Sequence, residues 1–233
     1  MATKKSQRIA ILVIAIVMTV GTIGSFAVMI LAQQEQSKNA AALQKAQVAY
    51  EKEQKAYQVK VDAQADELSA TYYPTFSQFF DRVGSFDIDS VKELATEDLV
   101  VGDGEEITGT TAFSTYFLGW DANGNKFTGG NNVDFDKQKL TAPFAVADGL
   151  DNASLIDGWK EGIKGMHLGG VRLLTIPSDK AYKEAGNDTI APNMPLKFLV
   201  MAIPTPAEVP VPDTYTKAMT EYMQAQAKAS GSY

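Results

Sequence analysis

The stretch LIDGWKEGIKGMHLGG, residues 155–170, holds the residue types of this chain that are most often used for chemistry. It contains the single histidine of the protein, His167, together with Trp159 and five glycines. A histidine can act as a general base or bind a metal ion, and a glycine-rich loop can bind phosphate. Each of these uses has to be weighed against a structural use of the same residues.

Composition and residue order exclude several kinds of site. The chain has no cysteine, which excludes disulfides, thiolate metal sites and cysteine nucleophiles, and a Ser-His-Asp triad would depend on His167 alone. The glycines lack the G-x-G-x-x-G order of dinucleotide loops and the G-K-[ST] of P-loops, and they come at the end of a predicted helix instead of before one. We therefore expect no metal and no cofactor, and we interpret His167 as a surface or cap histidine.

The apolar residues of this stretch recur at helical spacing, which predicts a short helix between two strand-like runs. Ser154 or Asn152 is available as its N-cap, and Gly169-Gly170 are expected to end it, because glycine adopts left-handed geometry at low cost. The apolar face consists of Leu155, Ile156, Trp159, Ile163 and Met166.

An uncharged run near the N-terminus, residues 9–32, predicts a membrane anchor. At about 1.5 Å per residue it spans roughly 36 Å as a helix, enough for a bilayer core of about 30 Å. A cleaved secretory signal is the alternative, since residues 1–8 form a basic flank, but the run is longer than a signal core and lacks a cleavage site. The basic flank predicts a single-pass protein of the cytoplasmic membrane with its N-terminus inside and its C-terminal domain outside.

Residues 33–71 are expected to continue this helix as a stalk, because residues 33–70 lack Gly and Pro and are rich in strong helix formers. Leu43, Tyr50 and Tyr57 lie seven residues apart and form a weak heptad seam, which would allow an oligomer of stalks. A solvated stalk that packs on its own domain is the alternative.

Residues 72–93 are predicted to be a connecting helical segment. Pro74 is expected to end the stalk helix or to begin a new one. An amphipathic piece follows, and its apolar face, which needs a partner, is made of Phe76, Phe79, Phe80 and Val83.

From residue 94 the pattern changes to short alternating runs separated by turn signals, which predicts a mostly antiparallel β domain with one short helix over residues 94–203. Residues 204–233 begin as a proline-rich linker and end in a segment expected to form a frayed helix. The net charge of −7 and the lack of a basic patch interleaved with aromatic residues exclude nucleic acid as a favoured partner.

The residue order resembles that of a known family. SLIDGWKEGIKGMHLGGVRLLTIPSDKAY, residues 154–182, is similar to the core of FKBP-type peptidyl-prolyl isomerases, which typically read V-I-x-G-W-x-E-G-[LV]-x-G-M-x-x-G before a strand ending in I-P and then A-Y-G. The similarity continues through IAPNMPLKFLVMAI, residues 190–203, and covers residues 94–203. It implies an α+β fold, an FKBP-like half-barrel of twisted antiparallel sheet around a short helix, here preceded by the predicted transmembrane helix and long helical stalk.

The resemblance also implies roles for individual residues. Trp159 would form the floor of an apolar pocket, the backbone N–H of Ile156 would donate to a substrate carbonyl, and the Tyr182 hydroxyl would be a donor at the lip. The other implied substrate-binding residues are Phe117, Phe127, Phe144, Leu155, Ile190 and Phe198.

Three positions depart from the family pattern. Phe117 stands where a tyrosine is usual, Thr128 stands at the position of the pocket aspartate, and Lys183 replaces the glycine of A-Y-G. An insertion follows Thr128, and its Asp134 or Asp136 is a candidate to return a carboxylate to the pocket.

The leading hypothesis is a peptidyl-prolyl cis-trans isomerase that assists folding of exported proteins at the outer side of the bacterial cytoplasmic membrane. It would act on proline-containing polypeptide segments, and the resemblance implies that macrolide inhibitors bind its pocket. Two alternatives stay open. One is a catalytically weak FKBP-like binding or chaperone module, and the other is a structural membrane protein that oligomerises through its stalk.

Overall fold

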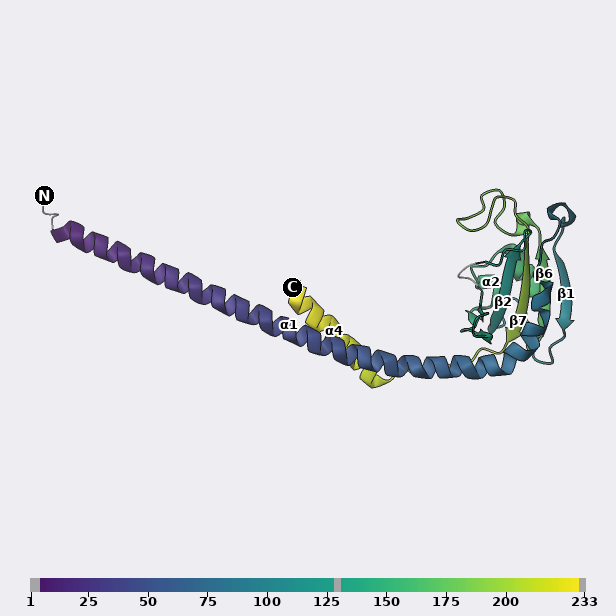
Figure 1. Cartoon of the computed structure of the whole chain (residues 1–233), viewed down its shortest axis with the longest axis horizontal. Coiled ribbons are helices and arrows are strands. Elements are labelled where there is room, and N and C mark those ends of the chain that lie inside the picture. The colour runs from purple at the N-terminus through teal and green to yellow at the C-terminus, as the bar shows by residue number, and fades with distance from the viewer. Residues whose placement is uncertain (1–4, 128–130, 231–233) are drawn as a thin grey trace. The chain divides into compact units, whose positions relative to one another are not determined.

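The computed structural model describes residues 5–127 and 131–230, with side chains described from residue 33 onward. The chain divides into two units, Met1–Val59 with Pro210–Tyr233, and Lys60–Val209. Helix α1, Lys5–Phe76, extends through both units, whereas the described strands all belong to the second unit (Figure 1).

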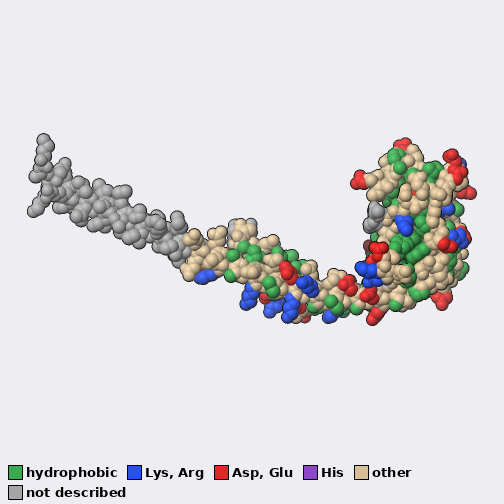
Figure 2. Space-filling view, in the orientation of Figure 1, with side chains coloured by type: hydrophobic (Ala, Val, Ile, Leu, Met, Phe, Trp, Pro, Cys, Tyr) green, Lys and Arg blue, Asp and Glu red, His purple; other side chains and the backbone are tan. Residues whose placement is uncertain are grey.

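The first unit is a pair of helices. α1 is continuous over the predicted stalk, and α4, Asp213–Ser230, forms where a terminal helix was expected. Tyr50 stacks on Tyr215 and Tyr222 with ring centroids 5.7 and 5.4 Å apart, and Tyr57 stacks on Tyr215 at 5.4 Å. Lysine side chains project from the described part of α1 on the face shown in Figure 2. The tyrosines of the predicted seam therefore contact the C-terminal helix of their own chain.

The predicted membrane location needs correction. Among the residues whose side chains are described, no helix combines the length and the apolar character needed to cross a bilayer. The predicted anchor, residues 9–32, is helical in its backbone, but its side chains lie outside the described residues. We therefore correct the location predicted above: the structure does not support a single-pass placement in the cytoplasmic membrane with an external C-terminal domain.

Helix α1 ends close to its proline. Pro74 lies in the last turn of α1, which ends at Phe76. A proline removes one helical N–H donor and crowds the carbonyl four residues before it, which weakens the helix at this point. Two 3₁₀ turns follow, Ser77–Arg82 and Ile88–Ser90. The segment predicted to be helical between the stalk and the β domain is thus made of the end of α1, 3₁₀ turns and extended chain.

The second unit contains a five-stranded antiparallel sheet in the order β1-β6-β7-β2-β5 and a separate hairpin, β3–β4. The alternating runs that predict strands form β2, β6 and β7, which confirms the predicted antiparallel sheet. The strands are β1 Ala95–Val100, β2 Phe113–Asp121, β3 Val133–Asp134, β4 Lys139–Leu140, β5 Phe144–Val146, β6 Val171–Ile176 and β7 Leu196–Ile203.

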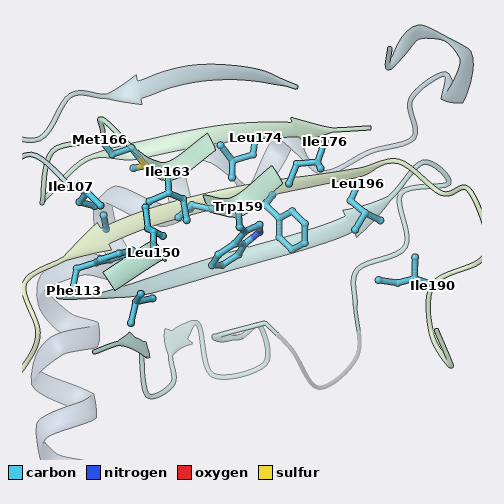
Figure 3. Packing of buried hydrophobic residues seen from close by; sticks show 14 residues of the cluster. Ile107, Phe113, Leu150, Trp159, Ile163, Met166, Leu174, Ile176, Ile190 and Leu196 are labelled. Carbon is cyan, nitrogen blue, oxygen red and sulfur yellow. The ribbon is translucent and has the colours of Figure 1, made fainter. Parts of the chain in front are cut away.

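The sheet is covered on both faces. Successive residues of a strand point to opposite faces, and on β2 this places Phe117 against the core cluster that contains residues of the short helix α3, Asp157–Ile163. Figure 3 shows the buried side chains of this cluster. Tyr116, Leu118 and Trp120 belong to a second cluster on the other face. The chain before β1 covers this second cluster with Tyr72, Tyr73, Phe76, Phe79, Phe80, Val83 and Phe86.

Tyr116 carries a hydroxyl group that is buried in the second cluster and has no hydrogen-bond partner among the described residues. Burial, as the main cause, raises the pKa of Tyr116 from 10.0 to about 12. Because the folded state holds this proton more tightly than the unfolded state, the contribution of the group to stability is complete below about pH 10. It is lost as the pH rises from about 10 to about 12.

We expect Tyr116→Phe to raise the free energy of unfolding of the second unit by about 1–2 kcal/mol, because it removes a buried polar group without a partner. The variant should also lose less stability between neutral pH and about pH 11 than the wild type. Urea unfolding followed by tryptophan fluorescence measures both effects, with Tyr73→Phe as the control in the same cluster. A destabilised Tyr116→Phe variant would show that the hydroxyl is satisfied in solution.

Candidate active site

Helix α3 begins at a backbone cap. Its N-cap is Ile156, in extended conformation, and the Ile156 carbonyl accepts from the N–H groups of Trp159 at 3.0 Å and Lys160 at 3.3 Å. The predicted side-chain caps, Ser154 and Asn152, are not used. The Asn152 side chain instead donates to the Asp148 carbonyl at 3.1 Å, next to the separate helix α2, Gly149–Asn152.

Helix α3 also ends earlier than Gly169-Gly170, where the sequence predicts its end. It stops at Ile163 and runs into a turn in which Lys164 has φ −55° and ψ 135°, and Gly165 has φ +81°. The Met166 N–H closes this turn on the Ile163 carbonyl at 3.0 Å. These angles define a type II turn, whose third residue needs the positive φ that glycine adopts readily. Gly165 therefore ends the helix.

Two glycines on one face of α3 let the helix approach β6 closely. A Cβ atom at Gly158 would lie 2.3 Å from Ile176 Cγ2, and one at Gly162 would lie 2.9 Å from Leu174 Cδ2. Contacts of this length do not occur between real side chains, so a larger residue at Gly158 would push helix and strand apart, and one at Gly162 would displace the Leu174 side chain. These two glycines therefore serve the close packing of α3 on β6.

We expect Gly158→Ala to destabilise the second unit by about 1–3 kcal/mol, because overpacking outweighs the roughly 1 kcal/mol by which alanine favours a helix. The control is Gly84→Ala, since a Cβ at Gly84 would meet no atom within 4 Å. The midpoints of urea unfolding compare the two variants. Equal midpoints for Gly158→Ala and wild type would show that α3 moves away from β6 at no cost.

Arg172 of β6 holds the C-terminal end of α3. Its Nη1 donates to the carbonyls of Gly162 at 2.9 Å and Lys164 at 3.3 Å. Its Nε and Nη2 pair with the two carboxylate oxygens of Asp98 in β1, at 2.6 and 3.0 Å. A positive charge is favourable at a helix C-terminus, and this one is 9% exposed. The helix is thereby tied to two strands of the sheet.

An apolar cavity of about 390 Å³ lies beside the start of α3. One aromatic side chain each from β2, β5, β7 and α3 lines it, together with three residues just before α3 and Tyr182 of the loop between β6 and β7. The lining residues are Phe117, Phe144, Ser154, Leu155, Ile156, Trp159, Tyr182 and Phe198.

Trp159 lies at the centre of the aromatic group. The rings of Phe117 and Phe198 meet its indole edge-on, with centroids 5.0 and 5.3 Å away and interplanar angles of 89° and 90°. Edge-to-face pairs contribute roughly 0.5–1.5 kcal/mol each beyond burial, so they fix the ring. Trp159 is 4% exposed, and its Nε1–H is buried without a hydrogen-bond partner among the described residues. Figure 3 shows the indole among the buried side chains of the core cluster.

Two donors lie on the wall of the cavity. Among the hydrogen bonds of the described residues, none uses the backbone N–H of Ile156, whose carbonyl is occupied by α3. The Tyr182 hydroxyl likewise has no protein partner in the described part of the chain, and the side chain is at the surface, 36% exposed. A ligand in this cavity therefore meets aromatic surface and two hydrogen-bond donors.

Seven of the predicted site residues line this cavity, and four do not. Phe127 does not line it, but its ring packs on Phe198 at 5.6 Å. Ile190 is buried in the core cluster that contains Trp159. Ser154 lines the cavity although sequence reasoning considered it only as a cap; its place directly before Leu155 and Ile156 was the available signal.

The predicted carboxylates are part of the β3–β4 hairpin and do not line the cavity. Asp134 accepts from the Lys137 backbone N–H at 3.0 Å and pairs with Lys137 Nζ at 3.3 Å. The backbone hydrogen bond is the main cause that lowers the pKa of Asp134. Asp136 is exposed in the same turn. Thr128, the other position of this prediction, lies outside the described residues.

His167 and Lys183 do not line the cavity, and both form hydrogen bonds with the backbone of other residues. The His167 Nδ1 atom lies 2.8 Å from the Gly104 carbonyl, and the residue is half-buried. Lys183 has φ +57°, so it occupies a backbone conformation that favours the glycine of the family pattern. Its N–H donates to the Ser178 carbonyl at 2.9 Å, and its carbonyl accepts from Asn193 at 2.8 Å, which holds the loop next to Tyr182.

The cavity wall has no charged side chain among the described residues, and no group of three or more acidic or histidine side chains in the described part of the chain is arranged to hold a metal ion. The arrangement is suited to binding an apolar ring and a carbonyl group.

Comparisons with known proteins agree with this geometry. Residues 103–202 match the sequence model of a family described as FKBP-type peptidyl-prolyl cis-trans isomerase. An FK506-binding protein of Neisseria meningitidis serogroup A is 36% identical over 99 residues, which are 42% of this chain and 83% of that protein. A probable FK506-binding protein of Corynebacterium glutamicum is 32% identical over 110 residues, 47% of this chain and 84% of that protein.

A crystal structure of a peptidyl-prolyl cis-trans isomerase from Pseudomonas syringae pv. tomato is 27% identical, with a TM-score of 0.39 over 57% of this chain and 92% of that one. The identity to the Neisseria protein, over most of its length, establishes the relationship. The chain belongs to the FKBP-type peptidyl-prolyl cis-trans isomerase family.

Proposed function

We propose that the cavity beside α3 binds proline-containing polypeptide segments and catalyses rotation about the prolyl bond. The observation that carries this proposal is the unpaired N–H of Ile156 at the edge of an aromatic cavity whose floor is Trp159. A proline ring fits against the indole, and the Ile156 N–H and the Tyr182 hydroxyl donate to carbonyl oxygens of the substrate. Phe117, Phe144, Leu155 and Phe198 surround the ring.

This chemistry needs no nucleophile or general base. Rotation about a peptide bond breaks amide resonance, against a barrier of about 18–20 kcal/mol, and a prolyl bond takes tens to hundreds of seconds to isomerise. A site that excludes water and binds the twisted amide better than either planar form lowers that barrier. Each 1.36 kcal/mol is a factor of about ten in rate, so aromatic contacts and two donors are sufficient for catalysis.

The test is a prolyl-peptide isomerisation assay on the full chain, with peptides that vary the residue before proline. We expect turnover above the uncatalysed rate, and a kcat/KM that is constant from about pH 6 to about pH 8, because no carboxylate, histidine or lysine lines the described cavity. FK506, the macrolide in the names of the relatives, should compete with the peptide. Turnover equal to the uncatalysed rate would refute the isomerase proposal.

A binding or chaperone module is the second candidate function. It is favoured by the phenylalanine at position 117, which brings no hydroxyl to the cavity, and by the absence of carboxylates from the described lining. In this case the cavity would hold proline-containing segments without accelerating their isomerisation. Saturable peptide binding, measured by a change in Trp159 fluorescence, combined with no turnover would select this function.

A further inference from the structure

Strand β2, which supplies Phe117 to the cavity, has an unusual edge. β5 pairs with β2 only over Phe113–Thr115, so the groups of Phe117 and Gly119 on this edge have no strand beside them. Unpaired backbone groups at a strand edge are normally satisfied by water or by another strand. Here two consecutive asparagines, Asn131 and Asn132, take the place of the missing strand.

Asn132 binds both backbone groups of Phe117. Its Oδ1 accepts from the Phe117 N–H at 3.3 Å, and its own backbone N–H donates to the Phe117 carbonyl at 3.2 Å. These bonds reproduce on one residue the pair of contacts that a neighbouring strand would make. Phe117 in turn places its ring 5.0 Å from the indole of Trp159.

Asn131 binds both backbone groups of Gly119, two residues further along β2. Its Oδ1 accepts from the Gly119 N–H at 2.8 Å, and its Nδ2 donates to the carbonyls of Gly119 at 3.4 Å and Phe127 at 3.1 Å. Phe127 also donates its N–H to the Gly119 carbonyl at 3.0 Å. One amide therefore joins β2 to the segment that carries Phe127, whose ring supports Phe198.

Asn132 also binds the segment just before Phe144, a residue that lines the cavity. Its Nδ2 donates to the Ala142 carbonyl at 2.8 Å, and its carbonyl accepts from the Thr141 N–H at 3.0 Å, just before Phe144. The ring of Phe144 meets that of Phe117 edge-on at 6.3 Å. Both Phe117 and Phe144 are thus held through this asparagine.

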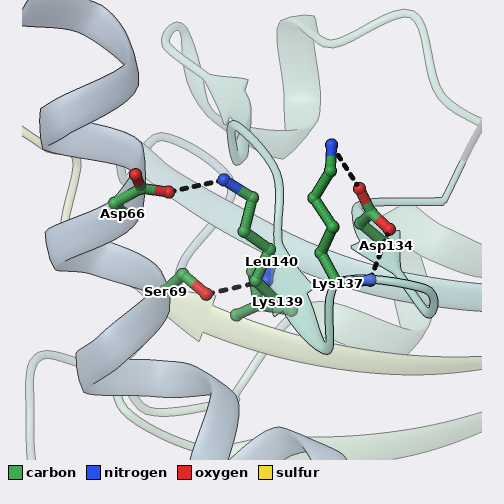
Figure 4. Close-up of polar contacts among 6 residues, drawn as sticks. All are labelled: Asp66, Ser69, Asp134, Lys137, Lys139 and Leu140. Carbon is green, nitrogen blue, oxygen red and sulfur yellow. Dashed lines mark hydrogen bonds and ion pairs between the residues drawn. The ribbon is translucent and has the colours of Figure 1, made fainter.

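The hairpin between these contacts is itself fixed to α1. Lys139 pairs with Asp66 at 2.6 Å, and the Leu140 N–H donates to the Ser69 Oγ at 2.8 Å, where Ser69 is 4% exposed (Figure 4). The two asparagines therefore directly precede a hairpin that is bound to α1.

We propose that Asn131 and Asn132 are positioning residues of the isomerase site, which hold Phe117, Phe127 and Phe144 at the distances that shape the cavity around Trp159. The proposal rests on the proposed function of the cavity for its kinetic consequences, but its structural content is independent of turnover. The two asparagines do not line the described cavity and act through the phenylalanines.

The experiment compares Asn131→Ala, Asn132→Ala and Asn132→Asp in the full chain. Each alanine variant is expected to lower kcat/KM for a prolyl peptide about tenfold, the effect of about 1.4 kcal/mol on the transition state. Asn132→Asp keeps the acceptor for the Phe117 N–H and should lose only about threefold. Asn123→Ala, at an exposed turn asparagine after β2, should keep wild-type activity.

A second readout is the NMR signal of the Trp159 indole N–H, which senses the ring currents of Phe117 and Phe198. We expect it to shift in both alanine variants and to stay in place in Asn123→Ala. An unchanged Trp159 signal in both alanine variants overturns the positioning role, whether or not the wild type has isomerase activity. Equal losses for Asn132→Asp and Asn132→Ala would overturn the role of the acceptor. An Asn132→Ala variant that does not fold, beside a folded and active Asn132→Asp, supports it.

Discussion

Replacing Trp159 by alanine is expected to lower kcat/KM for prolyl peptides about a hundredfold, equivalent to about 2.7 kcal/mol of transition-state stabilisation. The indole is the floor of the cavity and the surface against which two phenylalanine rings pack edge-on. Its removal enlarges the cavity, admits water and lets Phe117 and Phe198 turn inward. The assay of the full chain at several substrate concentrations separates the effect on kcat from the effect on KM.

Trp159 is also a core residue, so its loss destabilises the second unit by roughly 3–5 kcal/mol and needs a matched control. Ile107 is fully buried in the same cluster but does not line the cavity, and Figure 3 shows it far from Trp159 along the cluster. Ile107→Ala should lose about 2–5 kcal/mol of stability and keep kcat/KM within about threefold of wild type under conditions where it is folded. Similar activities of the two variants would show that Trp159 is not part of the site.

Replacing Phe76 by alanine is expected to reduce the free energy of unfolding of the second unit by about 3–5 kcal/mol, a large part of the roughly 5–15 kcal/mol typical of a domain. Phe76 is the last residue of α1, is fully buried, and meets the ring of Phe80 edge-on at 5.4 Å. It belongs to the cluster on the face of the sheet opposite the cavity. The loss therefore affects stability and leaves the cavity wall in place.

Urea unfolding of the full chain followed by tryptophan fluorescence measures this effect, because both tryptophans, Trp120 and Trp159, lie in the second unit. Phe135→Ala is the matched control, since Phe135 also contacts Phe80, at 5.5 Å, but is 40% exposed. It should cost less than about 1.5 kcal/mol. If Phe76→Ala unfolds at the wild-type urea concentration, the end of α1 is not part of the cooperative unit.

The sequence predicted the parts of the fold that depend on local patterns. The alternation of apolar residues correctly predicted strands β2, β6 and β7. The family resemblance predicted seven of the residues that line the cavity. Helix limits were less accurate, because Gly165, Gly169 and Gly170 all suit a helix end and only the turn closed by Met166 selects the first of them.

Long-range partners could not be predicted in the same way. In the sequence, Asn131 and Asn132 look like ordinary loop residues. Their role depends on hydrogen bonds to the edge of β2, and the sequence does not show which residues lie beside that edge. The carboxylates of the insertion were plausible pocket residues from sequence, but Lys137 three residues later binds Asp134 locally. The membrane location failed for another reason: it was inferred from residues 1–32 alone, and the described helices provide no support for it.

The position of β7 has a consequence for synthesis of the chain. β7 is the last strand in sequence, yet it lies in the middle of the sheet, between β6 and β2. Until β7 has been synthesised, the edges of β6 and β2 that pair with it lack this partner, and unpaired edges invite pairing with other chains. In a nascent chain the prolyl isomerase domain thus stays unfinished until its last strand has been made.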